Sequence, residues 1–557
     1  MSEGLKTESP GARELSTRTR AMNIDRIERE AFDLAIIGGG ITGAGVALDA
    51  ASRGLSVALI ERRDFASGTS SRSSKLIHGG LRYLEQFEFS LVREALGERS
   101  TLARTAPHLS KPLAFLVPVY STDEQSPLGS NKLKLRAGLW LYDLLAGRKN
   151  IARHRWLSHE ETLRLAPSLE SKNLRGAFVY YDCLTDDARL VIEVIKAASQ
   201  YNAAVANYVE ARGFIKTDGR VAGVQVEDRL NNRRVELRAK IVVNATGVWS
   251  DEVSRLADPD AEKRLRPSKG IHVVMPSEKF GNDVAVLIPS LGEQRFLFVI
   301  PWQGRTVIGT TDTDYAGDLD EPRAESEEIK RVVESAARSF PGAAVSTGDV
   351  ISSYAGLRPL VGGIDRSTKE LSRKEEIFES EPGLISIIGG KLTTYRRMAE
   401  QVVDVVEQSL GRGKSRRPAH SITSERIALA GSSSLADDWK EEATRAANEF
   451  GVTVATAARL IETYGGNYKI VLGITRESED LKRTLARGLP HIEAEVVYAA
   501  RHEMAVTVED FLARRTRITL TARDGGRSCA TRVASLMARE LGWSEAEAQK
   551  AMAGFST

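Results

Sequence analysis

A glycine turn near the N-terminus constrains the fold of this chain more than any other feature. Gly38, Gly40 and Gly43 form the pattern G-x-G-x-x-G between an apolar strand and a helix, and a second apolar strand follows at 56–60. The missing side chains allow a tight turn, close approach of the backbone to a pyrophosphate, and close packing of helix on strand. Glu61, at the end of the second strand, can accept hydrogen bonds from a ribose diol. These features predict a β-α-β unit that binds a dinucleotide.

Two later segments extend this turn into a larger site. Segment 245–247 (Ala-Thr-Gly) follows the apolar run 240–243, and segment 389–391 (Gly-Gly-Lys) follows the apolar run 384–388. A helix beginning near Lys391 would direct its N-terminal amides at the pyrimidine end of a flavin, where two-electron reduction places negative charge. The Lys391 side chain would add to that stabilisation. Because FAD and NAD share an ADP half, the first turn does not separate them, but the later segments favour FAD.

The loop after Glu61 adds a third piece. Residues 68–80 are rich in serine and threonine and end in paired glycines. This composition is typical of a loop whose backbone lies close to a ligand. A polar surface loop is the alternative interpretation.

The strands of the nucleotide-binding sheet lie far apart in the sequence, which predicts a discontinuous domain. Alternating residues at 271–275, 295–301 and 306–310 predict an antiparallel sheet that covers the site. The fold class is therefore α/β: a discontinuous Rossmann-like FAD-binding domain with an antiparallel β-sheet substrate domain and an α-helical C-terminal domain. The predicted boundaries are 1–30 for a flexible N-terminal tail; 31–110, 173–267 and 349–412 for the FAD-binding domain; 111–172 and 268–348 for the substrate domain; and 413–557 for the helical domain.

Composition excludes several classes of function. The 557 residues exceed what one hydrophobic core organises, and 78 basic against 75 acidic residues leave a charge of +3, too small to indicate a nucleic-acid partner. Two cysteines and no apolar run of about 18 residues indicate a cytosolic protein, soluble or peripheral to a membrane. We expect no metal, because His502-Glu503 is followed by Val506 where the zinc motif requires histidine.

One segment has the composition of a membrane-surface helix. Residues 139–145 are mainly apolar and aromatic, and lysines and arginines flank them at 132–136 and 148–155. Such a helix suits an anionic bilayer interface, although a core helix of the substrate domain would show the same pattern. The basic cluster 514–517 is a second surface candidate, for contact with phospholipid, the FAD-binding domain or a second subunit.

Six motifs occur in order along the chain: GGGITGAG, TSSRSSKLIHGGLRYLE, VNATGVW, PWQGRTVIGTTDTDY, GLRPL and GGKLTTYR. Together they resemble the FAD-dependent glycerol-3-phosphate dehydrogenases of the aerobic, respiratory type, over roughly residues 31 to 555. The resemblance implies a glutathione-reductase-like FAD-binding domain of the D-amino-acid-oxidase superfamily. It also implies oxidation of sn-glycerol 3-phosphate to dihydroxyacetone phosphate by hydride transfer to flavin N5, with electrons passed to membrane quinone. The protein would be cytoplasmic, peripheral on the cytoplasmic face of the cell membrane, with a homodimer left open.

That substrate requires cations at one end of its site, for the phosphate dianion, and a proton acceptor near the flavin at the other. Arg82, Arg358 and, by a looser alignment, Arg373 match cationic positions of the family, and the planar fork of arginine suits a phosphate. Tyr83 and Thr311 are further candidates for substrate contact. For any one of these residues, an ordinary surface or packing role is the alternative.

The predicted catalytic set is His272, Lys391 and Arg358. His272 is the first candidate for the base, since histidine can be neutral near pH 7, although a structural histidine is the alternative. Lys391 competes for that role if nearby arginines depress its pKa. The predicted FAD contacts are Gly38, Gly40, Thr42, Gly43, Glu61, Thr69, Ser70, Ser74, Lys75, Leu76, His78, Gly79, Ala245, Thr246, Gly247, Gly390, Lys391, Leu392 and Thr393.

Two other functions compete with the dehydrogenase. A glycerol-3-phosphate oxidase would use the same flavin chemistry but pass electrons to O2 and produce H2O2. Oxidases of this type carry an extra stretch before the GLRPL arginine, and the spacing from Thr311 to Arg358 leaves little room for it. A flavin-bearing binding module without catalysis would not need Arg82, Arg358 and Lys391 together.

Overall fold

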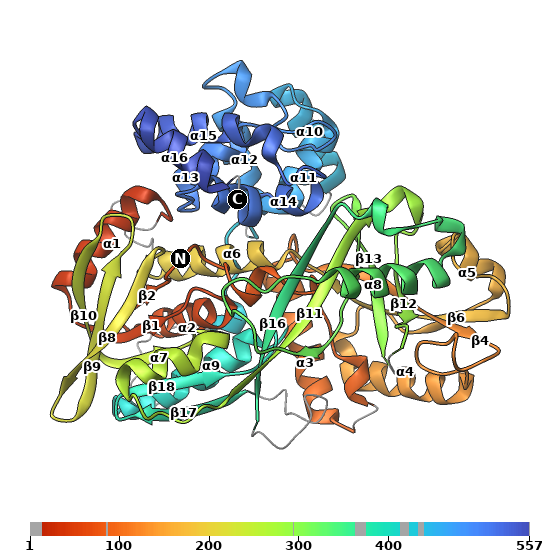
Figure 1. Ribbon diagram of the computed structural model, residues 1–557, viewed down its shortest axis with the longest axis horizontal. Helices are drawn as coiled ribbons and strands as arrows, with labels where there is room; N and C mark the ends of the chain where they lie inside the picture. The colour runs from red at the N-terminus through yellow and green to blue at the C-terminus, as the bar shows by residue number, and fades with distance from the viewer. Residues whose placement is uncertain are drawn as a thin grey trace, which may run out of the picture.

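In the described part of the chain, two β-sheets lie side by side with a helical unit packed above them, as Figure 1 shows for the computed structural model. The structure describes residues 14–84, 87–292, 295–362, 375–412, 423–432 and 439–555, without the side chain of Arg82. Among these residues, no helix is both long enough and apolar enough to cross a membrane. The helices are α1 (Thr17–Arg29), α2 (Ile41–Ser52), α3 (Phe89–Thr105), α4 (Lys132–Ala146), α5 (His159–Leu165), α6 (Asp187–Gln200), α7 (Ser250–Ala257), α8 (Ser326–Ser339), α9 (Tyr395–Ser409), α10 (Trp439–Phe450), α11 (Val454–Tyr464), α12 (Tyr468–Ile474), α13 (Ala494–His502), α14 (Ile518–Thr521), α15 (Arg527–Leu541) and α16 (Glu545–Phe555).

The first sheet contains the predicted β-α-β unit. Its strands lie in the order β17-β18-β10-β1-β2-β7, parallel except for β17, and the hairpin of β8 and β9 extends β10. Every residue of β1 and β2 is buried, as expected for parallel strands covered on both faces. Helices α2, α6 and α9 pack on one face, and α1 with the β8–β9 hairpin covers the other. The strands are β1 (Phe32–Ile37), β2 (Val57–Ile60), β7 (Ala204–Ala206), β8 (Val209–Thr217), β9 (Arg220–Asp228), β10 (Arg233–Asn244), β17 (Glu376–Glu381) and β18 (Leu384–Ile388).

The second sheet is antiparallel apart from one parallel pair, β4 with β12, which confirms the predicted sheet type. The predicted strand residues 271–275, 295–301 and 306–310 correspond to parts of β11, β13 and β14. The strands are β3 (Leu76–Ile77), β4 (Lys111–Tyr120), β5 (Arg155–Leu157), β6 (Leu174–Leu184), β11 (Leu265–Pro276), β12 (Ala285–Pro289), β13 (Phe296–Trp302), β14 (Arg305–Gly309), β15 (Thr313–Asp314) and β16 (Ser352–Val361).

Three strands belong to a different sheet from the one that their segments predicted. β3, β6 and β16 lie in segments 31–110, 173–267 and 349–412, assigned above to the FAD-binding domain, but all three pair within the second sheet. An apolar strand pattern does not identify the partner strand, which only the tertiary fold selects. The consequence for the site is direct, because β16 pairs with β11 and places Arg358 opposite Ser268.

The N-terminal segment is not a flexible tail over its whole length. Residues 17–29 form α1, and Ser16 and Thr19 cap its first turn reciprocally. Ile24 and Ile27 are buried, and the ion pair of Arg20 with Asp228 is 2.6 Å long. The charged residues of this helix obscured its apolar side in the sequence.

Helix α9 begins at Tyr395, four residues later than the predicted start at Lys391. Gly389 and Gly390 both have left-handed backbone, with φ values of 86° and 89°, and a turn at 392–394 separates them from the helix. The left-handed pair redirects the chain, so the helix cannot begin directly at its end. Lys391 therefore lies directly before this turn, between β18 and the helix.

Candidate active site

A first pocket, which we call the glycine-turn pocket, lies at the carboxyl ends of β1, β10 and β18. This is where open parallel sheets bind their ligands. The lining includes Gly38, Gly40, Thr42, Glu61, Thr69, Ser70, Ala245, Thr246, Gly247, Gly390, Lys391 and Leu392, all of them predicted FAD contacts.

The glycine turn has no room for side chains. Gly38 has a left-handed φ of 113°, and a Cβ on Gly43 would lie 1.9 Å from the Gly38 carbonyl oxygen. Gly40 is the N-cap of α2 and has no side chain to cap it, and the Ser70 hydroxyl accepts a hydrogen bond from the Ile41 amide at 2.9 Å. The Glu61 carboxylate accepts hydrogen bonds from the amides of Gly39 (2.7 Å) and Arg63 (2.9 Å). This geometry fits an ADP half, with the pyrophosphate at the start of α2 and the ribose at Glu61.

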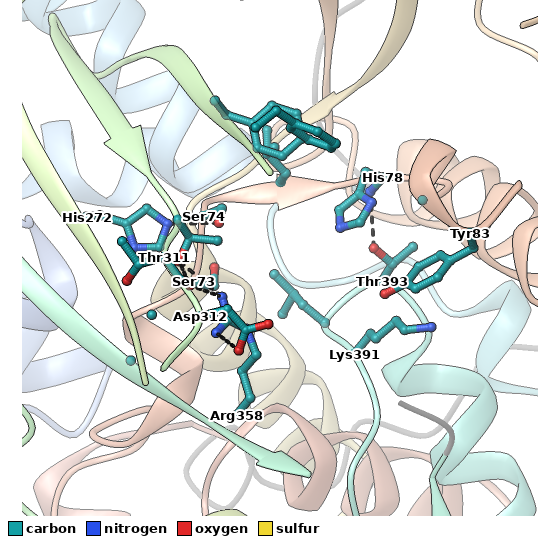
Figure 2. Close-up of a pocket in the computed structure, with 18 of the residues that line it drawn as sticks. Ser73, Ser74, His78, Tyr83, His272, Thr311, Asp312, Arg358, Lys391 and Thr393 are labelled. Carbon is teal, nitrogen blue, oxygen red and sulfur yellow. Dashed lines mark hydrogen bonds and ion pairs between the residues drawn. The ribbon is translucent and has the colours of Figure 1, made fainter. Parts of the chain in front are cut away.

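A second pocket, the cationic pocket, adjoins the first. Figure 2 shows its two sides facing each other, with His272, Asp312 and Arg358 on one side and Tyr83 and Lys391 on the other. The two pockets share Thr69, Ser73, Pro359, Gly389, Gly390, Lys391 and Leu392. A ligand in the glycine-turn pocket can therefore extend into the cationic pocket.

Arg358 is held in the cationic pocket by the second sheet. From β16, its Nη1 lies 3.3 Å from Oδ1 of Asp312, and its Nη2 donates to Thr310 Oγ1 (3.1 Å) and to the Thr311 carbonyl (3.0 Å). The Thr311 hydroxyl accepts a hydrogen bond from the Ile271 amide and is thereby turned into the sheet. These bonds fix the direction of the guanidinium before any ligand binds.

Arg295 is a second cation of this pocket, which the sequence analysis missed. Its Nη1 lies 2.5 Å from Oδ2 of Asp312, and its side chain is only 8% exposed. Its Nη2 is buried and has no hydrogen-bond partner within the described part of the chain. Burial raises the pKa of Asp312, but Arg358, Ser268 and Arg295 outweigh it and hold the pKa below its ordinary value. One carboxylate thus faces two guanidiniums, and the cluster carries net positive charge.

His272 lies on β11 at the wall of the cationic pocket. Its Nε2 is 2.8 Å from the Ser74 hydroxyl, and its ring stacks on Tyr354 with a centroid distance of 4.8 Å. Burial, with the positive charges of Lys75 and Arg358, lowers the pKa of His272 to about 3. The imidazole is therefore neutral at neutral pH.

On the facing side, Lys391 lies between the two pockets. Its Nζ is 4.1 Å from the centroid of the Tyr83 ring, in a cation–π contact. The amide of His78 donates to Thr393 Oγ1 at 3.1 Å, which ties the loop after η1 (Thr69–Ser71) to the turn before α9. Ser74, Leu76 and His78 all line the cationic pocket.

Several predicted contacts are placed elsewhere. Lys75, predicted to bind FAD, lines neither pocket. Its backbone is left-handed, with a φ of 61°, and its Nζ forms a buried ion pair with Asp187 at 2.8 Å. Gly79 also lines neither pocket, and its amide donates to Asp182 and to the Tyr142 hydroxyl. Sequence alone does not reveal a positive φ at a lysine. The side chain of Arg82, and Arg373 altogether, lie outside the described residues.

The basic cluster 514–517 is buried against the first sheet and its loops. Arg515 and Arg514 pair with Asp64 at 2.8 and 2.6 Å, and Arg517 pairs with Asp187 at 2.9 Å. Of the three partners left open by the sequence, the FAD-binding unit is the one that the cluster contacts. The cluster lies on the π-helix η12 (Asp510–Arg515) and the residues directly after it.

Comparison with known proteins identifies what this arrangement is similar to. Residues 33–396 match the family model described as FAD dependent oxidoreductase, and residues 422–548 match that of the C-terminal domain of alpha-glycerophosphate oxidase. The chain is 39% identical over 545 residues to glycerol-3-phosphate dehydrogenase 2 of Mycobacterium tuberculosis, covering 97% of this chain and 90% of the relative. It is 38% identical over 511 residues to aerobic glycerol-3-phosphate dehydrogenase of Staphylococcus aureus, covering 90% and 89%.

A solved structure matches along the full fold. The glycerol-3-phosphate dehydrogenase from Bacillus halodurans, complexed with FAD, has a TM-score of 0.79 and 33% identity to this chain, covering 97% of each. These matches confirm the resemblance carried by the six motifs, the predicted fold class and FAD as the cofactor.

Proposed function

The chain belongs to the family of FAD-dependent glycerol-3-phosphate dehydrogenases, and from that membership we propose that it oxidises sn-glycerol 3-phosphate to dihydroxyacetone phosphate and passes the electrons to a membrane quinone. When bound, FAD supplies N5 as the acceptor of the hydride. The observation that carries the proposal is the pair of guanidiniums, Arg358 and Arg295, around Asp312 in a pocket that adjoins the glycine-turn pocket.

We assign the phosphate to the Arg358 side of the cationic pocket. A phosphate dianion needs several charge-assisted donors, and the arginine fork presents two in parallel. The buried Nη2 of Arg295 supplies another donor. Arg82 and Arg373 remain proposed contacts from the family resemblance, and Tyr83 and Thr311 remain further proposed contacts. With the phosphate held there, the carbinol end of the substrate extends toward Lys391 and the glycine-turn pocket.

For the proton we propose His272 as the base, with Lys391 providing positive charge beside the cofactor. The low pKa of His272 keeps the ring neutral, as a base must be. The incoming phosphate dianion opposes the cations Lys75 and Arg358 and so raises that pKa in the complex. Lys391 is the competing base.

Replacing His272 by asparagine tests this role. We expect the rate of flavin reduction to fall about 10²- to 10⁴-fold, the usual contribution of a positioned general base. In wild-type protein, because the pKa of His272 is lowered, the base form is lost only as the pH falls toward about 3, so kcat/KM has no acid limb near 6.5 from this group. Stopped-flow flavin reduction across pH measures both effects. An unchanged rate in the variant at every pH would transfer the role to Lys391.

The second candidate function is a glycerol-3-phosphate oxidase. It is considered because the family model that matches residues 422–548 is described as the C-terminal domain of alpha-glycerophosphate oxidase. Anaerobic mixing of the yellow protein with glycerol 3-phosphate separates the possibilities. We expect the flavin to bleach, to stay reduced for long after oxygen is admitted, and to reoxidise rapidly with a quinone. Rapid reoxidation by oxygen with stoichiometric peroxide would establish the oxidase, and absence of bleaching would contradict both enzymes.

We further propose that the protein works in the cytoplasm, peripheral on the cytoplasmic face of the cell membrane. A quinone is lipid-soluble, so an enzyme that reduces it must reach the bilayer surface. Fractionation of cells into membrane and soluble parts, with a salt wash of the membranes, tests this location.

A further inference from the structure

Helix α4 has two apolar faces, and only one of them is covered. Leu139, Tyr142 and Ala146 are buried against the second sheet and its neighbours. The opposite face carries Leu133, 78% exposed, and Trp140, 61% exposed, followed by Leu144 at 58%. Trp140 and Leu144 follow Leu133 by seven and eleven residues, so the three side chains form one stripe along the helix.

Two further exposed aromatic residues lie at the start of α3, a helix that contacts α4. Phe87 is 77% exposed and Phe89 is 40% exposed, with their rings edge to face at 6.0 Å. A folded protein rarely leaves several large apolar side chains exposed together without a partner. We call Leu133, Trp140 and Leu144 the outer apolar face.

The exposed charges along α4 and directly after it have one sign. Between residues 132 and 149 there are five cations, Lys132, Lys134, Arg136, Arg148 and Lys149, all exposed. The one acid in that stretch, Asp143, is occupied by Asn150 and by the ring and amide of His154, at 2.6 to 3.0 Å. A second copy of the chain would bring five more cations against the first five, which disfavours a dimer through this face. An anionic bilayer complements both the apolar stripe and the cations.

The covered face of α4 is joined to the active-site loop. The Tyr142 hydroxyl donates to Asp182 at 2.7 Å and accepts from the Gly79 amide at 3.0 Å. The 3-10 helix η2 (Leu81–Leu84), which contacts both α3 and α4, carries Tyr83 into the cationic pocket. Because a helix with its side chains is about 10–12 Å across, the outer apolar face lies about one helix diameter from this loop.

We propose that the outer apolar face is the surface through which the protein docks on an anionic phospholipid bilayer. This docking surface rests on the proposed function, because it would be the site of the membrane attachment proposed there. Vesicle binding through it can be measured without enzyme turnover. The helix lies in the plane of the interface, with Trp140 at headgroup depth and the flanking lysines and arginines on lipid phosphates. Docked in this way, the active-site loop is close to the lipid phase that holds a quinone.

The test compares matched double variants of the FAD-loaded protein. Trp140→Glu/Leu144→Glu changes the proposed surface, and Val454→Glu/Ile470→Glu changes two similarly exposed apolar residues of the C-terminal unit. Flotation with vesicles of phosphatidylcholine, alone or mixed equally with phosphatidylglycerol, measures binding. We expect wild type and the control to bind the anionic vesicles, less strongly at high salt, and the α4 variant to bind about a hundredfold more weakly.

Oxidation of glycerol 3-phosphate with a soluble dye as acceptor shows whether each variant is folded and active, and is expected to stay unchanged. Equal vesicle binding by the α4 variant and wild type would overturn the proposal, as would a wild-type protein that turns over dye but binds no vesicles. A wild-type dimer in vesicle-free solution that the α4 variant abolishes would also overturn it, in favour of a second copy. Failure of dye-linked turnover in wild type would instead contradict the proposed function and leave the vesicle result standing.

Discussion

Replacing Arg358 by alanine is expected to raise KM for glycerol 3-phosphate about a hundredfold or more, while the flavin stays bound. The guanidinium is already aimed into the cationic pocket by Thr310, Thr311 and Asp312, so it pays little ordering cost when a phosphate arrives. Truncating one partner of such a hydrogen-bonded charge pair costs roughly 2–5 kcal/mol. Steady-state kinetics with a soluble acceptor measure KM, and the visible absorbance of bound flavin shows that the cofactor site is intact.

Two further variants define what is lost. Arg358→Lys keeps the charge but not the planar fork, so its KM should lie between those of wild type and Arg358→Ala. Arg266→Ala is the matched control: it removes an arginine of the adjacent strand β11 that pairs with Asp314 at 2.6 Å and does not line either pocket. We expect its KM to stay near that of wild type. A KM for Arg358→Ala within twofold of the control would remove Arg358 from the substrate site.

The nucleotide-binding part of the fold could be predicted because its signals are local. The turn at Gly38, Gly40 and Gly43 requires glycine for steric reasons that act within a few residues, since a Cβ on Gly43 would meet the Gly38 carbonyl. The strands beside it are buried on both faces and read as continuous apolar runs. Residue type and short-range spacing are therefore sufficient to predict this part of the fold.

The features that could not be predicted depend on contacts between distant residues. β16 joins the second sheet by pairing with β11, about 90 residues earlier in the chain. Arg295 is one arginine among many in the sequence, and only the fold places it across Asp312 from Arg358. Helix α1 hides its apolar side among charges that are paired at long range, as Arg20 is with Asp228.

The largest such omission is the charge network between the C-terminal unit and the active-site loop. Asp187, at the start of α6, accepts hydrogen bonds from Lys75, from Arg517, and from the amide and hydroxyl of Ser73. Ser73 lines both pockets, so one buried carboxylate joins the loop of the cofactor site to the C-terminal unit. The C-terminal unit therefore supports the site without lining it.

Replacing Asp187 by asparagine is expected to destabilise the protein by roughly 3–5 kcal/mol, because Lys75 and Arg517 then lose the buried carboxylate that they share, and Arg517 keeps only the longer pair with Asp186 at 3.7 Å. Thermal unfolding of the FAD-loaded protein should show a midpoint several degrees lower. Asp25→Asn is the matched control, since Asp25 is half exposed and its pair with Arg233 is a surface pair that solvent screens. A midpoint for Asp187→Asn equal to that of the control would show that the network does not hold the two units together.

The pH dependence of this loss gives a second, independent check on Asp187. Burial raises the pKa of Asp187, but Lys75 and Arg517 outweigh it and hold the pKa below the ordinary value of 3.8. A carboxylate with a lowered pKa in the folded state contributes stability above its unfolded pKa and loses it as the pH falls through the folded value. The gap in midpoint between wild type and Asp187→Asn should therefore be full at neutral pH and narrow only below about 3.8. A gap that is constant down to the most acidic pH at which wild type stays folded would mean that the asparagine disturbs packing, and that the charge of Asp187 is not what holds Lys75 and Arg517.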